Sequence, residues 1–179
     1  CGIVGIFKKS NKRKVATEGI ENVTKAPPPR AGLERHLRSG SAILAHERLS
    51  IVDPQSGGQP LYSPDRKQIL AVNGEIYNHR DIRAKYTEYD FQTGSDCEVI
   101  LALYRDKGIH FLEDLNGIFA FALYDEEKDD FLIARDPIGV IPLYIAGIRT
   151  AKYNCASELK ALEGSVMNDE PSFPAIDYL

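Results

Sequence analysis

Residues 117–136 read GIFAFALYDEEKDDFLIARD, in which two apolar runs flank a short charged segment. Each run has the length of a β-strand, and almost every residue in it is apolar. The charged segment, residues 125–130, has the composition of an exposed turn. The stretch therefore predicts a β-hairpin, and strands that are apolar on both faces are typical of sheets that are covered on both sides.

Apolar runs of strand length recur along the chain, separated by turn residues and a few amphipathic segments. Besides the hairpin, the expected strands are 2–7, 41–53, 68–74, 142–147 and 151–157, the expected helices are 12–25, 78–86, 95–108 and 157–163, and the expected loops are 25–32 and 54–60. This pattern predicts an α+β fold in which two sheets pack together and helices lie outside them.

The expected helices carry recognisable end signals. Ser95 and Glu98 have the spacing of a capping box, and Gly108 follows the last residue of the same helix. Asn78 and Ser157 stand at the starts of two other expected helices, where short polar side chains accept backbone hydrogen bonds. These signals predict helix starts that are capped by their own side chains.

The composition is that of an ordinary globular domain. The chain has 179 residues, of which 43% are hydrophobic and 27% charged, and its net charge of −4 argues against a sequence-independent nucleic-acid binder. No apolar run reaches the ~18 residues that span a membrane, and no signal peptide is visible. We therefore expect one cytoplasmic domain, with neither nucleic acid nor membrane as a partner.

Cysteine and histidine usage argues against disulfides and metal sites. Cys1, Cys97 and Cys155 are widely spaced, and an odd number of cysteines does not suggest a disulfide framework, so a reducing compartment is expected. The four histidines are scattered and lack the spacing of metal ligands. The sequence predicts neither a metal site nor a cofactor.

Cys1 is the candidate nucleophile. A thiol has a pKa of about 8.5 and is mostly protonated at neutral pH, whereas an α-amino group, with a pKa of about 7.7–8.0, is a suitable base. A first residue that is cysteine supplies both groups, so that the amine accepts the thiol proton and later returns it to a leaving group. We expect an initiator methionine to have been removed; the alternative is that Cys1 is an accident of processing.

An acyl-transfer reaction also needs groups that stabilise an oxyanion. Asn73 and Gly74 stand where a strand is expected to stop, so the Asn73 amide and the Gly74 N–H are candidate oxyanion donors. The alternative is an ordinary hairpin turn, which Asn-Gly often forms.

Two charged residues are candidates for substrate recognition. Arg48 lies within an otherwise apolar strand, and it would either hold a carboxylate through two hydrogen bonds or form an ion pair with Glu47 or Asp53. Asp96 lies in the first turn of the capped helix, where it would bind a substrate ammonium group or simply interact with the helix dipole.

Taken together, these stretches resemble a known family. The matching segments include CGIVGIF at 1–7, HERLSIVD at 46–53, NGEIYNH at 73–79 and TGSDCEVIL at 93–101. In order and spacing they are similar to the N-terminal glutaminase domain of class II glutamine amidotransferases, and within that family to bacterial-type, glutamine-hydrolysing asparagine synthetases. The resemblance covers residues 1–179 and implies an N-terminal-nucleophile hydrolase with a four-layer αββα sandwich.

The resemblance also assigns roles. Cys1 would attack the side-chain amide of L-glutamine, Asn73 and Gly74 would hold the oxyanion, and ammonia would leave before water released glutamate from a thioester. The expected substrate-binding set, which includes backbone groups lining the pocket, is Arg48, Leu49, Ile51, Val52, Asn73, Gly74, Glu75 and Asp96. Of these, Arg48 would hold the substrate carboxylate, whereas Asp96, with Gly74 and Glu75, would hold its amino group.

The chain departs from the family pattern in two respects. Residues 25–40 lack the usual Arg-His-Arg-Gly-Pro-Asp sequence, of which only Gly32, with Arg30 and Glu34, is matched. The resemblance also implies a C-terminal synthetase domain that uses ATP and Mg, and we expect no part of it within residues 1–179. SGGQP at 56–60 matches only the start of that domain's pyrophosphate loop and is expected to be a turn.

The sequence therefore predicts a glutaminase that supplies ammonia for asparagine synthesis in a longer enzyme. Its expected partners are L-glutamine and the missing synthetase domain, and a homodimer is left open. One alternative is the glutaminase domain of another class II amidotransferase, against which residues 46–53 and 95–104 argue. The other is a non-catalytic binding or assembly module, and Cys1, Arg48, Asn73 and Asp96 argue against it.

Overall fold

The computed structural model describes residues 2–8, 33–37, 42–47, 58–148 and 152–162. The helix predicted at 12–25 and the loop predicted at 25–32 lie outside these residues. So do the predicted site residues Cys1, Arg48, Leu49, Ile51 and Val52.

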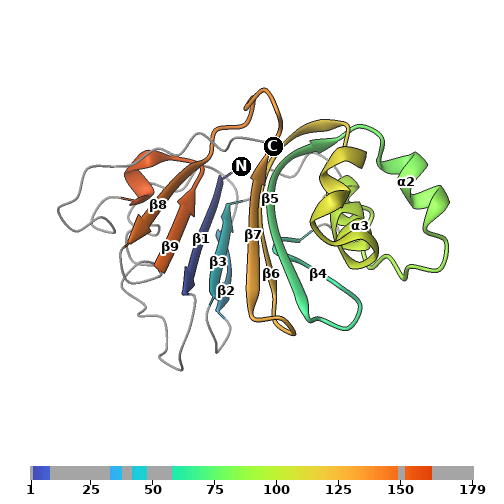
Figure 1. Ribbon diagram of the computed structural model, residues 1–179, viewed down its shortest axis with the longest axis horizontal. Coiled ribbons are helices and arrows are strands. Elements are labelled where there is room, and N and C mark those ends of the chain that lie inside the picture. Colours follow the sequence, from blue (N-terminus) through green and yellow to red (C-terminus); the bar gives the residue numbers. More distant parts are fainter. Residues whose placement is uncertain (1, 9–32, 38–41, 48–57, 149–151, 163–179) are drawn as a thin grey trace.

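Two antiparallel sheets face each other in the molecule (Figure 1). The first sheet has the strand order β2-β3-β1-β9-β8 and the second has the order β4-β5-β6-β7. The strands are β1 Gly2–Lys8, β2 Leu33–Leu37, β3 Ala42–Glu47, β4 Leu61–Tyr62, β5 Gln68–Ile76, β6 Gly117–Asp125, β7 Asp130–Arg135, β8 Tyr144–Ile148 and β9 Lys152–Ala156. All pairings are antiparallel, as predicted for an α+β sandwich.

One apolar core lies between the two sheets. Ile3 and Phe7 of β1 meet Ile69 and Ala71 of β5 there, and the ring of Phe7 stacks on that of Phe131 with 4.4 Å between centroids. Because side chains alternate along a strand, these residues define the inner face of each sheet.

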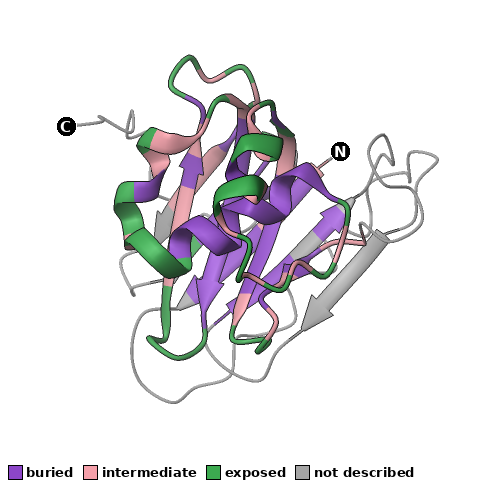
Figure 2. Ribbon diagram, turned by 90° about the vertical axis from the view of Figure 1, so that its right-hand side faces the viewer, coloured by how far each residue is buried: buried purple, intermediate pink, exposed green. Residues whose placement is uncertain are grey.

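A second core lies between the β4-β5-β6-β7 sheet and the helices. The helices are α2 His79–Lys85 and α3 Val99–Lys107, and the short 3-10 helices are η1 Asp96–Glu98, η2 Gly108–Asp114 and η3 Leu159–Leu162. Phe119 and Phe121 of β6 pack into this core, whereas Ala120 and Ala122 face the other sheet. Both faces of β6 are therefore covered, which explains its continuous apolar run, and Figure 2 shows the buried strands beneath the helices.

Both predicted hairpins are present. β6 pairs with β7 from Ala120–Arg135 to Asp125–Asp130, and β8 pairs with β9. Gly108 ends α3 with a φ of 58°, as expected for a glycine after a helix. None of the described helices has the length and apolar character needed to cross a membrane.

The strand β5 does not stop at Asn73-Gly74, and this corrects the prediction. It continues to Ile76, which pairs with Gly117 of β6. The Asn-Gly pair is therefore neither a strand end nor a hairpin turn, because pairing with β6 overrides the local turn preference of the dipeptide.

The predicted caps form only in part. Ser95 accepts a hydrogen bond from the Cys97 N–H, but the Glu98 carboxylate binds the preceding loop instead of completing a capping box. Asn78 precedes α2 without a side-chain cap, because its amide donates to the Asp114 carbonyl. The Ser157 hydroxyl accepts from the Ile3 N–H in β1. These polar side chains, which the local sequence assigned to helix ends, therefore bind residues elsewhere in the fold.

Candidate active site

The last part of β5, residues 72–76, is held by side chains along the edge that faces away from β6. The Gln59 amide pairs with both backbone groups of Val72, donating to the carbonyl at 2.9 Å and accepting from the N–H at 2.8 Å. Four residues further along the strand, the Ile76 N–H donates to Asp96 Oδ2 at 2.7 Å. Gly74 lies between these two anchors, and strand alternation directs its N–H to the same edge.

Glycine is required at two positions in the paired strands β5 and β6. Gly74 has a φ of 147°, and a Cβ built there would lie 2.1 Å from the Ile118 carbonyl oxygen. A Cβ on Gly117 would lie 2.2 Å from the Glu75 carbonyl oxygen. The two glycines therefore permit a contact that no other residue allows, and sequence analysis missed the role of Gly117.

Asp96 is buried next to this segment, with only 5% of its surface exposed. Besides the bond to Ile76, its Oδ2 lies 3.6 Å from the Cys97 sulfur, which is also 3.7 Å from the Gly74 carbonyl oxygen. The start of η1 and the end of β5 are thus joined by direct contacts. The structure brings together the predicted residues Gly74 and Asp96, which are far apart in the chain.

An ion pair between buried Glu98 and half-buried Arg83 supports the loop before Asp96, and sequence analysis did not identify it. Glu98 is 1% exposed and accepts hydrogen bonds from the N–H groups of Gln92 and Thr93 and from the Thr93 hydroxyl, at 2.6–2.8 Å. Arg83 lies 3.6 Å from Glu98 and donates to the carbonyls of Thr93 and Ser95. The only sequence signal was the Ser-x-x-Glu spacing, which suggested a cap.

The start of β1 lies beside the same part of β5. Gly2 pairs with Glu47 and Ile3 pairs with His46, and the buried His46 donates from Nε2 to the Val72 carbonyl at 2.8 Å. Ser157 fixes Ile3 by exchanging two hydrogen bonds with its backbone, each 3.0 Å long. The first described residue of the chain is thereby held near the residues that precede Asn73.

The four described site residues gather at one end of the sandwich. Asn73 lies on the inner face of β5, the face that also carries Ile69 and Ala71, because side chains alternate along the strand. Gly74 follows it and Glu75 is exposed. The remaining site predictions, Cys1, Arg48, Leu49, Ile51 and Val52, lie outside the described residues and stay predictions.

Neither of the two described cysteines has the character of a nucleophile. Both are buried free thiols. Burial raises the pKa of Cys97 well above its ordinary value, with the Asp96 charge adding to the effect, and burial raises the pKa of Cys155 to about 12. Both thiols are therefore neutral at physiological pH, whereas a nucleophilic cysteine needs access and a stabilised thiolate.

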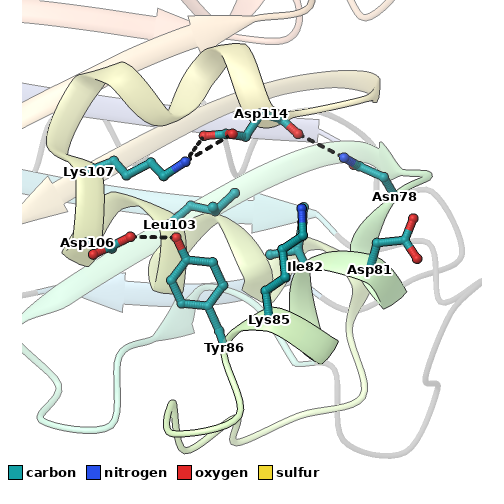
Figure 3. Close-up of a pocket in the computed structure, with 9 residues that line it drawn as sticks. All are labelled: Asn78, Asp81, Ile82, Lys85, Tyr86, Leu103, Asp106, Lys107 and Asp114. Carbon is teal, nitrogen blue, oxygen red and sulfur yellow. Dashed lines mark hydrogen bonds and ion pairs between the residues drawn. The ribbon is translucent and has the colours of Figure 1, made fainter.

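A surface pocket between α2, α3 and η2 contains none of the predicted site residues (Figure 3). Four of its polar side chains form two pairs: Tyr86 donates to Asp106 at 2.6 Å, and Lys107 pairs with Asp114 at 2.9 Å. These contacts join the helices across the groove. We therefore interpret the pocket as a groove between packed helices and not as a reaction site.

Comparison with known proteins gives a consistent result. The model of the glutamine amidotransferase domain family matches residues 1–177. Asparagine synthetase B (glutamine-hydrolyzing) of Escherichia coli strain K12 is 51% identical over 100% of this chain and 32% of its own length. The glutamine-hydrolyzing asparagine synthetases of Sandersonia aurantiaca and Zea mays are each 43% identical over 90% of this chain and over 31% and 28% of their own lengths.

The chain therefore spans about a third of the length of these curated relatives. The family match extends over both sheets and over the segment that joins Asp96 to β5. On this evidence the chain belongs to the glutamine amidotransferase domain family.

Proposed function

We propose that this chain hydrolyses L-glutamine to glutamate and ammonia, and that the ammonia serves asparagine synthesis in a longer polypeptide. Family membership and the names of the relatives support the reaction. The observation that carries the proposal is the hydrogen bond between buried Asp96 and the Ile76 N–H, which sets a carboxylate at the end of β5, two residues after Gly74. This arrangement suits a substrate that has both an ammonium group and an amide to be attacked.

In the proposed reaction Cys1 is the nucleophile. Its α-amine takes the thiol proton, and the sulfur attacks the side-chain carbonyl carbon of glutamine to form a tetrahedral intermediate. The amine then protonates the departing nitrogen, which leaves as ammonia, and a thioester results. Water attacks the thioester, and glutamate is released as the thiol is restored.

The Asn73 amide and the Gly74 N–H are the proposed oxyanion donors. Both belong to a strand that is fixed on one side by β6 and on the other by Gln59 and Asp96, so they are positioned before substrate binds. Donors that are already oriented stabilise developing charge without reorganisation, and loss of one typically costs about 10²–10³ in kcat.

Recognition of the substrate backbone is divided between two groups. Arg48 is proposed to hold the carboxylate, with the backbone of residues 49–52 along the pocket wall. Asp96, with Gly74 and Glu75, is proposed to hold the ammonium group. The buried position of Asp96 supports this role, because a charge pair shielded from water is stronger than one at the surface.

The proposal includes no cofactor for this domain, and ATP and Mg belong to the synthetase part of the longer polypeptide. It places the protein in the cytoplasm, where the buried thiols Cys97 and Cys155 stay reduced. An acceptor other than aspartate, as in another class II amidotransferase, is the alternative for the final product.

The test compares two cysteine substitutions. Cys1→Ala is expected to abolish glutamate release, whereas Cys155→Ala, in the core between the sheets, is expected to lower stability and leave turnover nearly unchanged. Glutamate release is measured on protein whose fold is checked by circular dichroism. Wild-type turnover in Cys1→Ala would contradict the mechanism, and a wild-type protein that releases no glutamate would favour a non-catalytic domain.

The role of the α-amine needs a separate experiment. A variant that retains one methionine before Cys1 keeps the thiol but converts the amine into a peptide N–H, which accepts no proton. We expect it to fold and to be inactive. If such a variant, verified by intact mass, hydrolyses glutamine as fast as the processed protein, the base is another group.

A further inference from the structure

Asn78 follows the end of β5, and its side chain binds a part of the chain that is distant in sequence. Its Nδ2 donates to the Asp114 carbonyl at 2.8 Å (Figure 3), and its Oδ1 accepts the Asn116 N–H at 3.1 Å. The neighbouring Tyr77 N–H donates to the Asn116 carbonyl at 2.8 Å. These hydrogen bonds join the residues directly after β5 to the connection between η2 and β6.

The two bonds of the Asn78 side chain need an amide. Asparagine carries a donor and an acceptor on separate atoms of one short side chain, whereas an ionised aspartate only accepts and a serine has a single oxygen. All three residue types begin helices about equally well. Because the Asn78 side chain makes no cap bond to α2, the position needs asparagine for the connection between η2 and β6 and not for the helix start.

The first consequence of these bonds concerns the end of β5. Gly117, the first residue of β6, pairs with Ile76 and packs closely on the Glu75 carbonyl. The Asn78 side chain closes the β5–β6 ladder directly after this last pair. On the edge that faces away from β6, the Ile76 N–H donates to Asp96 at 2.7 Å. The position of the last pair therefore also sets where β5 meets Asp96.

The second consequence concerns α2. The Asn78 carbonyl accepts the Ile82 N–H at 3.2 Å, which makes Asn78 the backbone start of the helix. Arg83, the next residue of α2, donates to the Ser95 carbonyl at 2.8 Å, and Ser95 directly precedes Asp96. Asn78 is therefore connected to Asp96 by two routes, one through the end of β5 and one through α2.

We propose that Asn78 is a positioning residue for the groups that hold the substrate ammonium. The inference rests on the proposed function, in which Asp96 acts there together with Gly74 and Glu75. The Asn78 side chain binds backbone outside this set, so it acts by fixing the end of β5 and the start of α2 relative to each other. Binding groups that are displaced by about 1 Å hold a substrate less well, so loss of these bonds weakens glutamine binding.

The test measures glutamine hydrolysis by the full natural polypeptide and its Asn78→Asp and Asn78→Ser variants. Both substitutions keep a good helix start, but neither side chain can bind the Asp114 carbonyl and the Asn116 N–H together. We expect KM for glutamine to rise about tenfold in both variants, with a smaller change in kcat. An unchanged KM in both would overturn the proposal, and a rise in Asn78→Asp alone would assign the effect to the added charge and would overturn it too.

Asp114→Asn is the matched control. It removes the ion pair with Lys107, which is 2.9 Å long, but keeps the backbone carbonyl that Asn78 binds. Its KM for glutamine is expected to stay at the wild-type value. A rise in KM as large as that of Asn78→Ser would show that any change in this segment has the same effect, and the specific role of Asn78 would be wrong.

Two further measurements test the connection to Asp96. Hydrogen exchange of a peptide that covers residues 72–78, followed by mass spectrometry, is expected to be about tenfold faster in Asn78→Ser than in wild type, because the Ile76 N–H is held less firmly. In a double-mutant cycle, adding Asn78→Ser to Asp96→Asn is expected to raise KM little further, since both changes affect the same contact. Unchanged exchange, or KM effects that multiply in full, would overturn the proposal.

These outcomes separate the positioning role from the reaction itself. Hydrogen exchange does not depend on turnover, so a wild-type polypeptide that releases no glutamate, while Asn78→Ser exchanges faster, contradicts the proposed function alone. A polypeptide that releases glutamate with the same KM in wild type and in both Asn78 variants contradicts the positioning role alone.

Discussion

Residues 126–129 join β6 to β7, and residues 137–142 leave the other end of β7 towards β8. In both places a buried aspartate at a strand end holds the following backbone: Asp125 accepts the N–H groups of Glu127 and Lys128, and Asp136 accepts those of two loop residues. Each aspartate is 2% exposed. The backbone device is the same at both ends of the strand.

The side chains of the two loops are opposite in kind. Residues 126–129 are Glu, Glu, Lys and Asp, and all are exposed, whereas residues 137–142 are apolar throughout. The charged turn lies far from the candidate active site along the strands, and the apolar loop lies one strand from Gly74. The comparison teaches that the two loops share a brace, meaning a buried aspartate whose carboxylate accepts backbone N–H groups of the loop. The exposed side chains of the two loops differ, so the brace does not determine them.

The largest expected effect at the active-site end is that of Gly74→Ala. The added Cβ would overlap the Ile118 carbonyl at 2.1 Å, and alanine rarely adopts a φ of 147°. The displaced N–H should lower kcat by about a hundredfold or more, with a clear loss of melting temperature.

Gly108→Ala is the matched control, because Gly108 also has a positive φ but a Cβ there meets nothing within 4 Å. It should cost about 1–3 kcal/mol of stability, because alanine is strained at this backbone conformation, and leave kcat unchanged. Equal losses of kcat in the two variants would show that the active-site end has no special demand for glycine.

Asp136→Ala and Asp125→Ala compare the two braces directly. Asp136→Ala leaves three backbone N–H groups without their acceptor, and we expect it to cost about 3 kcal/mol in denaturant unfolding. It should also lower kcat about tenfold, since Asp136 holds Phe119 opposite Gly74. Asp125→Ala should lower stability but keep kcat per folded molecule. A kcat loss in Asp125→Ala as large as that in Asp136→Ala would erase the distinction between the two ends.

Glu98→Gln tests the buried support of the Asp96 loop. The amide keeps the shape of the carboxylate but weakens the pairing with Arg83 and the bonds to Thr93, so Asp96 should be held less firmly. Because Asp96 is proposed to bind substrate, KM should rise about tenfold, with a smaller change in kcat. Glu113→Gln, an exposed residue on η2, is the control. A lower kcat at unchanged KM would argue against positioning through Asp96.

The smallest expected effect is a change in stability when acid protonates Asp136, which holds the apolar 137–142 loop. Burial alone would raise the pKa of Asp136, but hydrogen bonds from the N–H groups of Val140, Ile141 and Phe119 outweigh it and hold the pKa below 3.8. The stabilisation is therefore complete above pH 3.8 and is lost as pH falls through the lower, folded-state pKa. The loss amounts to about 1.4 kcal/mol for each unit of pKa depression.

The measurement is the difference in unfolding free energy between wild type and Asp136→Asn across the acid range. The difference should be constant at neutral pH and shrink only below pH 3.8. A difference that shrinks well above that pH would mean that burial, and not the backbone hydrogen bonds, dominates.

Much of the fold was predictable because its determinants are local. The length and apolar character of 117–136 specified the hairpin, and Gly108 marked the end of α3. Single residues of the candidate site could be proposed from their chemistry, but only family resemblance assigned them to one site. Asp96 taken alone was equally a residue at a helix start, and no local pattern distinguishes the two roles.

Side-chain partners decided the rest. Asn73-Gly74 looked like a turn, yet pairing with β6 draws it into a continuous strand. Glu98 looked like half of a capping box, yet burial beside Arg83 gives it a different set of partners. In each case a contact made across the fold outweighs a preference of at most about 1 kcal/mol in the local sequence.

By itself, the sequence determined where strands and helices lie, because periodicity and end signals act over a few residues. Only the tertiary structure decided which groups surround the end of β5: Asp96 reaches Ile76 across 20 residues of chain, and Asp136 reaches Phe119 across 17. It also decided that Ile138 and Val140 face outward, whereas Ile141 of the same loop packs against the core between the sheets. Burial depends on how the whole molecule packs. The sequence of an apolar run therefore does not reveal which of its residues remain exposed once the two cores have formed.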